Sequence, residues 1–280
     1  MKVLPFKIPK PDFGNLLYQV DKGTAFYDKL HQHEEIQVSF ILEGEGTLVV
    51  GDTVNYFNKN TLIVIGSNLP HVFKTDVGIT RNVHMLTLFF TASSFGSKFF
   101  DLDELKDLQA FFRRAKRGFQ ISSKPDPVKK LFLELERASK FNRFLILLQI
   151  LKLSAKAPYV ALSDYSYDKK YSDVEGHRMR NVFEYTMNHY DRDIHLDTIS
   201  NVANMTKNAF CKYFKKRTNK TYVQFLNELR ISKACQQLIA EKDKAIADIA
   251  QEVGFNNLSN FNRQFKAFKQ CRPSAYRNSI

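Results

Sequence analysis

The sequence is poor in cysteine and has no long apolar run, and both shortages narrow what the chain can be. Its three cysteines are far apart and form no C-x-x-C pair: Cys211, Cys235 and Cys271. This spacing predicts neither a disulfide framework nor a cysteine-based metal cluster, so buried or incidental thiols are expected. The longest apolar stretch, residues 144–151, is interrupted by Gln149 and is too short to cross a bilayer. The amino end is broken by Pro5 and Lys7 and does not resemble a secretory signal, so we expect a cytoplasmic protein.

Acidic residues are also scarce, with 29 Asp and Glu against 42 Lys and Arg and a formal net charge of +13. Residues 175–280 hold 18 Lys and Arg against 10 Asp and Glu, so most of the excess, +8, lies in the last 106 residues. A basic domain is steered towards phosphate and binds it with strong salt dependence. Charge alone would equally suit a ribosome-associated or membrane-surface protein, so the kind of partner must come from motifs.

Residues 246–277 have the pattern of two short helices joined by a tight turn. Apolar residues recur at helical spacing on either side of Gly254: Ile246, Ile249, Ala250 and Val253 before it, and Leu258, Phe261, Phe265 and Phe268 after it. Gly254 can adopt the left-handed conformation that ends a helix. With Phe261 and Phe265 facing the core, the opposite face of the second helix carries small, amide or basic side chains: Asn256, Ser259, Asn260, Arg263 and Ala267. Such a helix-turn-helix suits base reading, because Asn pairs with adenine and Arg with guanine.

The same pattern occurs once before, about fifty residues upstream. Leu196, Ile199 and Ala203 predict a first helix, Asn204-Met205 a turn, and Thr206 an N-cap for a second helix. In that helix Phe210 and Phe214 match Phe261 and Phe265, so we assign all four to the core. The first helices align at an offset of 50 residues and the second helices at 51. Residues 221–241 predict a connecting helix of about 32 Å, close to the roughly 34 Å between successive major grooves on one face of DNA.

These residues resemble the DNA-binding domain of the AraC/XylS family of bacterial transcription regulators. The second-half signature appears as Ala250, Gly254-Phe255, Ser259, Phe261, Arg263, Phe265-Lys266, Pro273 and Tyr276-Arg277, and the first half matches at Met205-Thr206, Phe210, Phe214-Lys215 and Arg230. Gln270 and Asn219 stand where the family has Gly, and Ser200 replaces a small apolar residue. The resemblance implies base contacts from Asn208, Ala209, Cys211, Lys212, Asn256, Ser259, Asn260 and Arg263. It also implies phosphate contacts from Thr206, Lys215 and Lys266.

The first ninety residues have a different pattern, that of short strands joined by tight turns. Strands are predicted over 36–42, 47–50, 53–57, 62–65 and 83–89, with turns at residues 43–46 and 51–52. This predicts a β-barrel or jelly roll. The spacing of His31, His33, Gln37, Gly44 and the later His71 resembles the two motifs of cupins, which in AraC-like regulators commonly serve as effector-binding domains.

Two interpretations of the three histidines remain open. We expect His31, His33, Gln37 and His71 to line a pocket for a small-molecule effector, by analogy a sugar or glycan-derived signal. In metal cupins a Glu stands where this chain has Gln37, so no metal cofactor is expected, and His31, His33 and His71 are only candidate ligands.

The fold class predicted is therefore α+β and multidomain, since 280 residues that are 44% apolar can bury two cores. We expect a cupin-like β-barrel over 1–95, a helical segment over 96–157, a linker over 158–173 and a DNA-binding domain with two helix-turn-helix motifs over 174–280. In the helical segment we expect helices from Asp101 with Glu104, from Asp126-Pro127, and over 141–153; the last is apolar enough to pack on the barrel or to form a homodimer.

The predicted function is ligand-controlled, sequence-specific transcription regulation, with activation favoured over repression and no catalytic residues. Expected partners are double-stranded DNA, a small-molecule effector and a second copy of the chain, with RNA polymerase as a candidate. Two rival hypotheses are a metal-dependent cupin enzyme with an accessory DNA module, and a constitutive DNA-binding protein whose barrel only dimerises.

Overall fold

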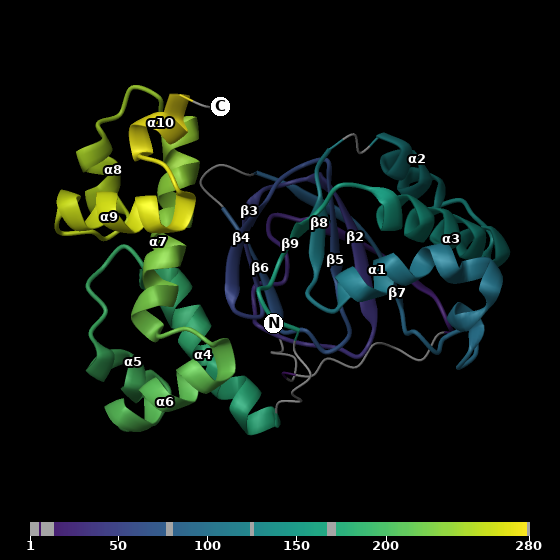
Figure 1. Cartoon of the computed structure of the whole chain (residues 1–280), viewed down its shortest axis with the longest axis horizontal. Coiled ribbons are helices and arrows are strands. Elements are labelled where there is room, and N and C mark those ends of the chain that lie inside the picture. Colours follow the sequence, from purple (N-terminus) through teal and green to yellow (C-terminus); the bar gives the residue numbers. More distant parts are fainter. Residues whose placement is uncertain (1–5, 7–13, 77–80, 124–125, 167–171, 279–280) are drawn as a thin grey trace. The chain divides into compact units, whose positions relative to one another are not determined.

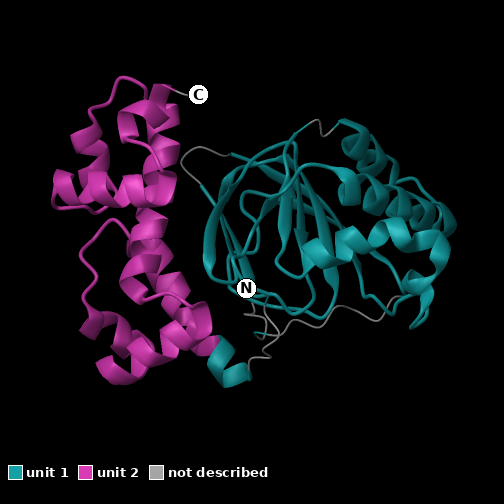
Figure 2. Cartoon of the chain, in the orientation of Figure 1, with its two compact units in different colours: residues 1–176 teal, residues 177–280 magenta. Residues whose placement is uncertain are grey.

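The structure, a computed structural model, describes the chain except for residues 1–5, 7–13, 77–80, 124–125, 167–171 and 279–280 (Figure 1). The chain divides into two compact units, Met1–Gly176 and His177–Ile280 (Figure 2). The first unit is rich in sheet and the second is helical, as the sequence predicts. Among the described residues, no helix combines the length and the apolar character needed to cross a membrane.

The strands of the first unit form two antiparallel sheets, one six-stranded in the order β1-β7-β2-β5-β8-β9 and one three-stranded in the order β4-β3-β6. Their bounds are β1 (Leu17–Gly23), β2 (Ile36–Glu43), β3 (Gly46–Val50), β4 (Thr53–Phe57), β5 (Thr61–Ile65), β6 (His71–Thr75), β7 (Val83–Phe90), β8 (Phe119–Ile121) and β9 (Val160–Ala161). The strands predicted over 36–89 are confirmed, whereas β1 and β6 were not predicted. The sheet also extends past residue 95, because β8 pairs with β5 and β9 pairs with β8.

Strands β2, β5 and β7 of the six-stranded sheet are largely buried on both faces, and alternate residues of each strand take alternate faces. On β2, Val38 and Phe40 pack in the core shared with the helices, whereas Ile41 packs in a second core with residues of the three-stranded sheet. Gln37 and Ser39 share the parity of Ile41, which places polar side chains on the inner face. Two tight turns use asparagine in the left-handed region, Asn60 at φ 62° and Asn68 at φ 55°, where cupin motifs favour glycine.

Helices cover the outer face of this sheet: η1 (Phe99–Asp101), η2 (Asp103–Leu108), α1 (Gln109–Ala115), α2 (Asp126–Glu134) and α3 (Lys140–Lys156) (Figure 1). The expected capping box at Asp101 is wrong. Leu102 has an extended backbone, ψ 142°, which separates two short 3-10 helices, and neither has a side-chain cap. By contrast α3 has a cap, since Ser139 accepts a hydrogen bond from the Asn142 amide.

The second unit is all helical: α4 (Asp173–His189), α5 (Leu196–Val202), α6 (Lys207–Thr218), α7 (Tyr222–Ala240), α8 (Ile246–Glu252), α9 (Leu258–Lys269) and α10 (Pro273–Asn278). The connecting helix, α7, begins with a full capping box formed by Thr221 and Gln224. Phe225 near one end of α7 packs with α4 and α6, and Leu238 near the other packs with α8 and α9. Helix α7 therefore contributes side chains to both of the small cores of this unit.

Candidate functional site

The helical unit contains two copies of one helix pair. Helix α8 begins 50 residues after α5, and α9 begins 51 residues after α6, with α6 and α9 both 12 residues long. Each turn has one residue at positive φ, Asn204 at 51° and Gly254 at 91°. The backbone amide of the next residue donates a hydrogen bond to a carbonyl of the first helix. Met205 donates to the Ser200 carbonyl and Phe255 donates to the Ala250 carbonyl, each at 2.9 Å. The internal repeat in the sequence is therefore a repeat in backbone geometry.

The second helix of each pair begins and ends in the same way. Thr206 caps α6 by accepting from the Ala209 amide at 3.4 Å, and Asn257 caps α9 by accepting from the Asn260 amide at 3.0 Å. The Asn257 cap was missed, although a side-chain cap 51 residues after Thr206 was a visible signal. Gln270 ends α9 at φ 59°, as Asn219 ends α6 at 55°, so replacement of the family glycine does not reshape the helix end.

Four phenylalanines hold these helices to the core, as predicted: Phe210, Phe214, Phe261 and Phe265 are all fully buried. The rings of Phe210 and Phe214 lie against Tyr222 of α7, with centroids 5.6 and 5.5 Å away. The Phe261 ring lies between those of Phe255 and Phe265, at 5.3 and 5.6 Å. Burial of one face fixes which residues of α6 and α9 are presented outwards.

The opposite faces of α6 and α9 are exposed and carry most of the side chains predicted to contact DNA. Asn256, predicted on the face of the second helix, instead lies in the turn before α9, because Asn257 caps the helix and Leu258 begins it. Seven of the eight base-contact candidates are exposed and Asn260 is half-buried: Asn208, Ala209, Cys211, Lys212, Asn256, Ser259, Asn260 and Arg263. The phosphate candidates Thr206, Lys215 and Lys266 are exposed too, although the Thr206 hydroxyl is occupied as the N-cap. Arg263 donates to the Asn260 side-chain oxygen at 2.9 Å, which orients both groups along the helix.

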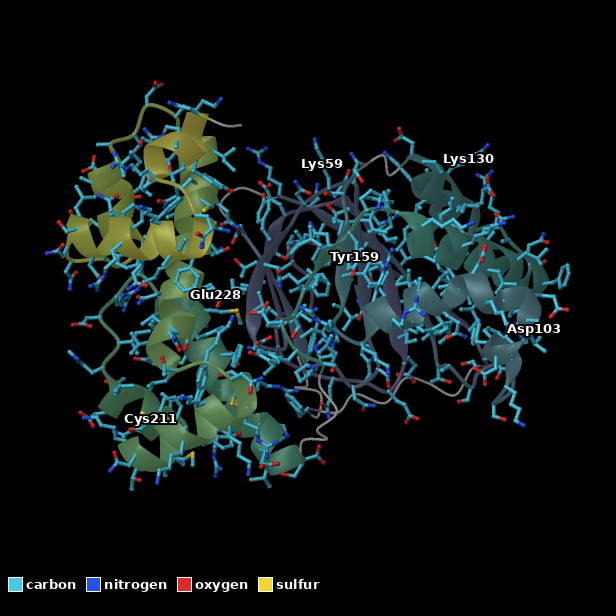
Figure 3. The ribbon with its side chains drawn as sticks, in the orientation of Figure 1. Lys59, Asp103, Lys130, Tyr159, Cys211 and Glu228 are labelled. Atoms are coloured by element: carbon cyan, nitrogen blue, oxygen red, sulfur yellow. The ribbon has the colours of Figure 1, made fainter. Side chains whose placement is uncertain are left out.

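The cysteines follow the expectation of incidental thiols. Cys211 is exposed on α6 (Figure 3), Cys235 is buried in α7, and none of the three is in a disulfide. Burial raises the pKa of the Cys235 thiol to about 11, so this group stays protonated and unreactive near neutral pH.

A buried arginine links the segment between α4 and α5 to the second helix pair. Arg230 of α7 donates to the carbonyl oxygens of Tyr190 and Arg192, both at 2.7 Å, in the segment between α4 and α5. Its guanidinium also lies 5.6 Å from the centre of the Phe255 ring, in the turn between α8 and α9. Burial lowers the pKa of Arg230, but the two carbonyls and the very high intrinsic pKa keep it charged. Gly254 fits here because a Cβ would stand 2.6 Å from the Tyr190 oxygen.

In the sheet-rich unit three histidines converge. His31, His33 and His71 are 8, 1 and 1% exposed, and one ligating atom from each lies within 4.8 Å of the others. His31 and His71 face each other across an isolated β-bridge, with ring centroids 4.3 Å apart, and His33 lies 5.1 Å from His71. The sequence predicted that these residues share a site, and the strand pairing brings them together.

Backbone carbonyls set the tautomer of all three rings. Each Nδ1 lies 2.8 Å from a carbonyl oxygen two residues away, on Lys29 for His31, Glu35 for His33 and Leu69 for His71. A carbonyl only accepts, so each Nδ1 carries a proton. In neutral His31 and His71, Nε2 then carries the lone pair. The Gln37 side-chain oxygen, an acceptor, lies 3.1 Å from the His33 Nε2, and the Gln37 amide nitrogen donates to the Ser39 hydroxyl at 2.9 Å.

A cavity of about 180 Å³ lies beside this cluster. The polar part of its wall is formed by Gln19, Asp21, Tyr27, His31, Gln37 and His71. The apolar part is formed by Phe26, Phe73, Met85 and Phe89. His33 does not line it but supports Gln37. Gln19 and Asp21 were missed because β1 was not predicted, and Tyr27 because it lies in the irregular segment that follows β1. The Gln19 amide donates to Asp21 at 2.7 Å.

The residues of this cluster fit only in part the metal that the cupin resemblance implies. Imidazoles whose Nδ1 donates to a backbone carbonyl have the outer hydrogen bonds typical of zinc-binding histidines. Gln37 would supply a neutral oxygen in place of a carboxylate, and Asp21, the carboxylate in the cavity wall, is bonded to Gln19. The set would hold a divalent cation with little neutralisation of its charge.

Comparisons with known proteins match the helical unit. The family model for a helix-turn-helix domain matches residues 199–279. The Transposon Tn10 TetD protein of Escherichia coli is 31% identical over 39% of this chain and 80% of its own length. The uncharacterized HTH-type transcriptional regulator YdeC of Bacillus subtilis is 23% identical over 92% of this chain and 89% of its own.

Two further likenesses cover nearly the whole chain. The probable transcriptional regulator LumQ of Photobacterium leiognathi is 24% identical over 92% of this chain and 93% of its own length. Among solved structures, ToxT from Vibrio cholerae O395 is 13% identical over 94% of this chain and 97% of its own, with a TM-score of 0.37. Together with the duplicated helix pair, the matches over the helical unit show that the chain belongs to the AraC/XylS family of DNA-binding, helix-turn-helix transcription regulators.

Proposed function

We propose that the two helix pairs are two helix-turn-helix units, and that α6 and α9 are the recognition helices of a ligand-controlled regulator. The observation that carries the proposal is the pair of outward faces, which hold exposed amide and basic side chains and, on α9, no carboxylate. An ordinary solvated helix would expose acidic residues as well. The absence of acidic side chains suits insertion into a groove flanked by phosphates.

The length of α7 supports simultaneous reading by both helices. Its 19 residues extend over about 28 Å, and a turn follows at either end. Successive major grooves on one side of a duplex are about 34 Å apart. One chain would therefore contact two adjacent segments, and the DNA site would be bipartite.

Arg263→Ala should weaken binding to the specific site by about 1–3 kcal/mol and relax base preference at one position, because Arg reads a base edge through paired hydrogen bonds. The measurement is sequencing of the genomic fragments that the purified protein retains at physiological salt. Wild type should return a shared bipartite motif, and the variant should lose information at one position of it.

Lys266→Ala is the matched control, since Lys266 is an exposed cation on the same helix. It should weaken binding to all sequences alike and leave the motif intact. If Arg263→Ala behaves in the same way, Arg263 contacts phosphate and the assignment of α9 as a base-reading helix by this residue is wrong.

The sheet-rich unit is proposed to be a cupin-like effector domain. The cavity beside His31, Gln37 and His71 offers hydrogen-bonding groups at one side and aromatic rings at the other, which suits a small polyhydroxylated molecule such as a sugar. Control requires that the ligand bind two arrangements of the protein with different affinity. We further propose that the regulator activates transcription through RNA polymerase. It would form a homodimer through α3, whose side chains Phe141 and Leu145 are exposed.

A second candidate is a metal-responsive regulator, favoured by the convergence of His31, His33 and His71. Zn²⁺ at a hundred times its Kd should raise the free energy of unfolding of the sheet-rich unit by about 2.7 kcal/mol. Thermal unfolding with Zn²⁺ at that free concentration, compared with unfolding in a chelator, tests this. His71→Asn should abolish the gain, and His84→Asn, which changes a histidine outside the cluster, should keep it. No gain in wild type would leave the effector proposal without a metal.

A further inference from the structure

We propose a second small-molecule site in the sheet-rich unit, an anion-binding pocket lined by three arginines. The cavity measures about 290 Å³ and is lined by Ala110, Arg113, Arg114, Arg117, Tyr159 and Ala161, here called the arginine pocket. It shares no lining residue with the histidine cavity. Residues 110, 113 and 114 lie on one face of α1, and residue 117 continues that spacing in the turn that follows the helix. Residues 159 and 161 come from the β9 segment.

Two of the guanidinium groups are held in place by neutral acceptors. The Arg114 Nη1 donates to the carbonyl oxygens of Ser154 and Ala157, at 2.9 and 3.0 Å, at the C-terminal end of α3. Its guanidinium carbon lies 4.2 Å from the centre of the Tyr159 ring. The Arg117 Nε donates to the Ser163 carbonyl at 2.9 Å. The remaining N–H groups of both arginines are thereby positioned without a ligand.

The positive charge of the pocket is not balanced by carboxylates. Within the described part of the chain, none of the three arginines is in an ion pair, and Asp107, the acidic residue that precedes them, is paired with Lys156 at 3.2 Å. Carbonyl oxygens orient a guanidinium but do not neutralise it. Three cations around one cavity repel one another, and an anion bound among them would relieve this repulsion.

The chemistry favours a small dianion, either a phosphate monoester or a dicarboxylate. Guanidinium groups form paired, charge-assisted hydrogen bonds with both kinds of oxyanion. Tyr159, 46% exposed at the pocket wall, offers a ring face to the rest of such a molecule (Figure 3). Tyr159 precedes β9 and Ala161 lies in it, and β9 pairs with Phe119 and Gln120 of β8. A bound anion would therefore fasten this strand to α1, in the stretch that leads towards the DNA-binding unit.

The test uses the full-length protein and isothermal titration calorimetry with inorganic phosphate and with succinate, at ionic strength held constant with chloride. Wild type should show saturable binding of at least one of the two, and which one identifies the oxyanion. Arg113→Gln with Arg117→Gln should weaken that binding by roughly tenfold or more, since both arginines are exposed and neither closes the end of α3.

The control variant also removes two positive charges, but from residues outside the arginine pocket. Lys59→Gln with Lys130→Gln changes two exposed lysines outside the pocket, both labelled in Figure 3, and should leave anion binding unchanged. Equal weakening in both double variants would overturn the proposal, because net charge would then explain the binding. Absence of saturable binding in wild type would also overturn it. Weaker DNA binding in the arginine variant alone, without small-anion binding, would assign these residues to the DNA backbone instead.

Discussion

Gly254→Ala should lower the free energy of unfolding of the helical unit by about 3 kcal/mol or more. The residue has φ 91°, where an L side chain is strained, and a Cβ would stand 2.6 Å from the Tyr190 oxygen. The same Cβ would stand 2.9 Å from the Arg230 Nε and Nη2, so the clash disturbs the hydrogen bonds that keep this buried cation satisfied. Urea unfolding of the full chain, with hydrogen exchange to locate the loss in α7–α9, is the measurement.

Gly96→Ala separates backbone strain from the contact. Gly96 has φ 112° but nothing within 4 Å of its added Cβ, so it should cost only the strain, about 1–2 kcal/mol. Gly254→Ala should exceed it clearly and should also reduce DNA affinity through misplacement of α9. Equal losses of stability in the two variants would contradict the inference that the missing Cβ of Gly254 leaves the space that the Arg230 side chain occupies beside the turn.

Phe261→Ala should remove about 3–5 kcal/mol of stability and abolish specific DNA binding by the second helix pair. Its ring is fully buried between Phe255 and Phe265, so truncation leaves a cavity that neighbouring helices can fill only in part. Since Phe261 fixes the rotation of α9, its loss disturbs the presentation of Asn260 and Arg263 on the same helix. Thermal unfolding and a binding titration on the bipartite site measure the two effects.

Phe268→Ala provides the comparison on the same helix. Phe268 is only partly buried against the core, so its loss should cost roughly 1 kcal/mol and leave specificity intact. If the two variants behave alike, burial of Phe261 is not what orients α9. A loss of DNA affinity without a loss of stability would mean that Phe261 contacts DNA, contrary to its assignment to the core.

The helical unit was the part most open to sequence reasoning. The spacing of Phe210, Phe214, Phe261 and Phe265 is a local, periodic signal, and a helix converts such a period directly into one buried face. For the same reason, the offsets of 50 and 51 residues predicted that the turn between α8 and α9 is one residue longer than the turn between α5 and α6. The sequence was less informative where Leu102 interrupts a helix, because one extended residue leaves the apolar period unchanged.

The sheet-rich unit depended more on pairing between distant segments. β1 carries Gln19 and Asp21 into the histidine cavity because it pairs with β7, more than sixty residues along the chain. β8 and β9 are too short to give a periodic pattern, and only their pairing with β5 and with each other makes them strands. Register over such distances is set by the whole core, so no local window contains it.

The sequence by itself therefore determined the family, the duplicated helix pair and the faces of α6 and α9 that point outwards, because each follows from residues close together in the chain. Only the tertiary structure decided that Arg230 links the Tyr190 carbonyl to the Gly254 turn, that three Nδ1 atoms donate to carbonyls, and that α1 and β9 enclose three arginines. Those contacts join residues far apart in sequence, and their geometry is fixed by strand register and helix packing rather than by local preference.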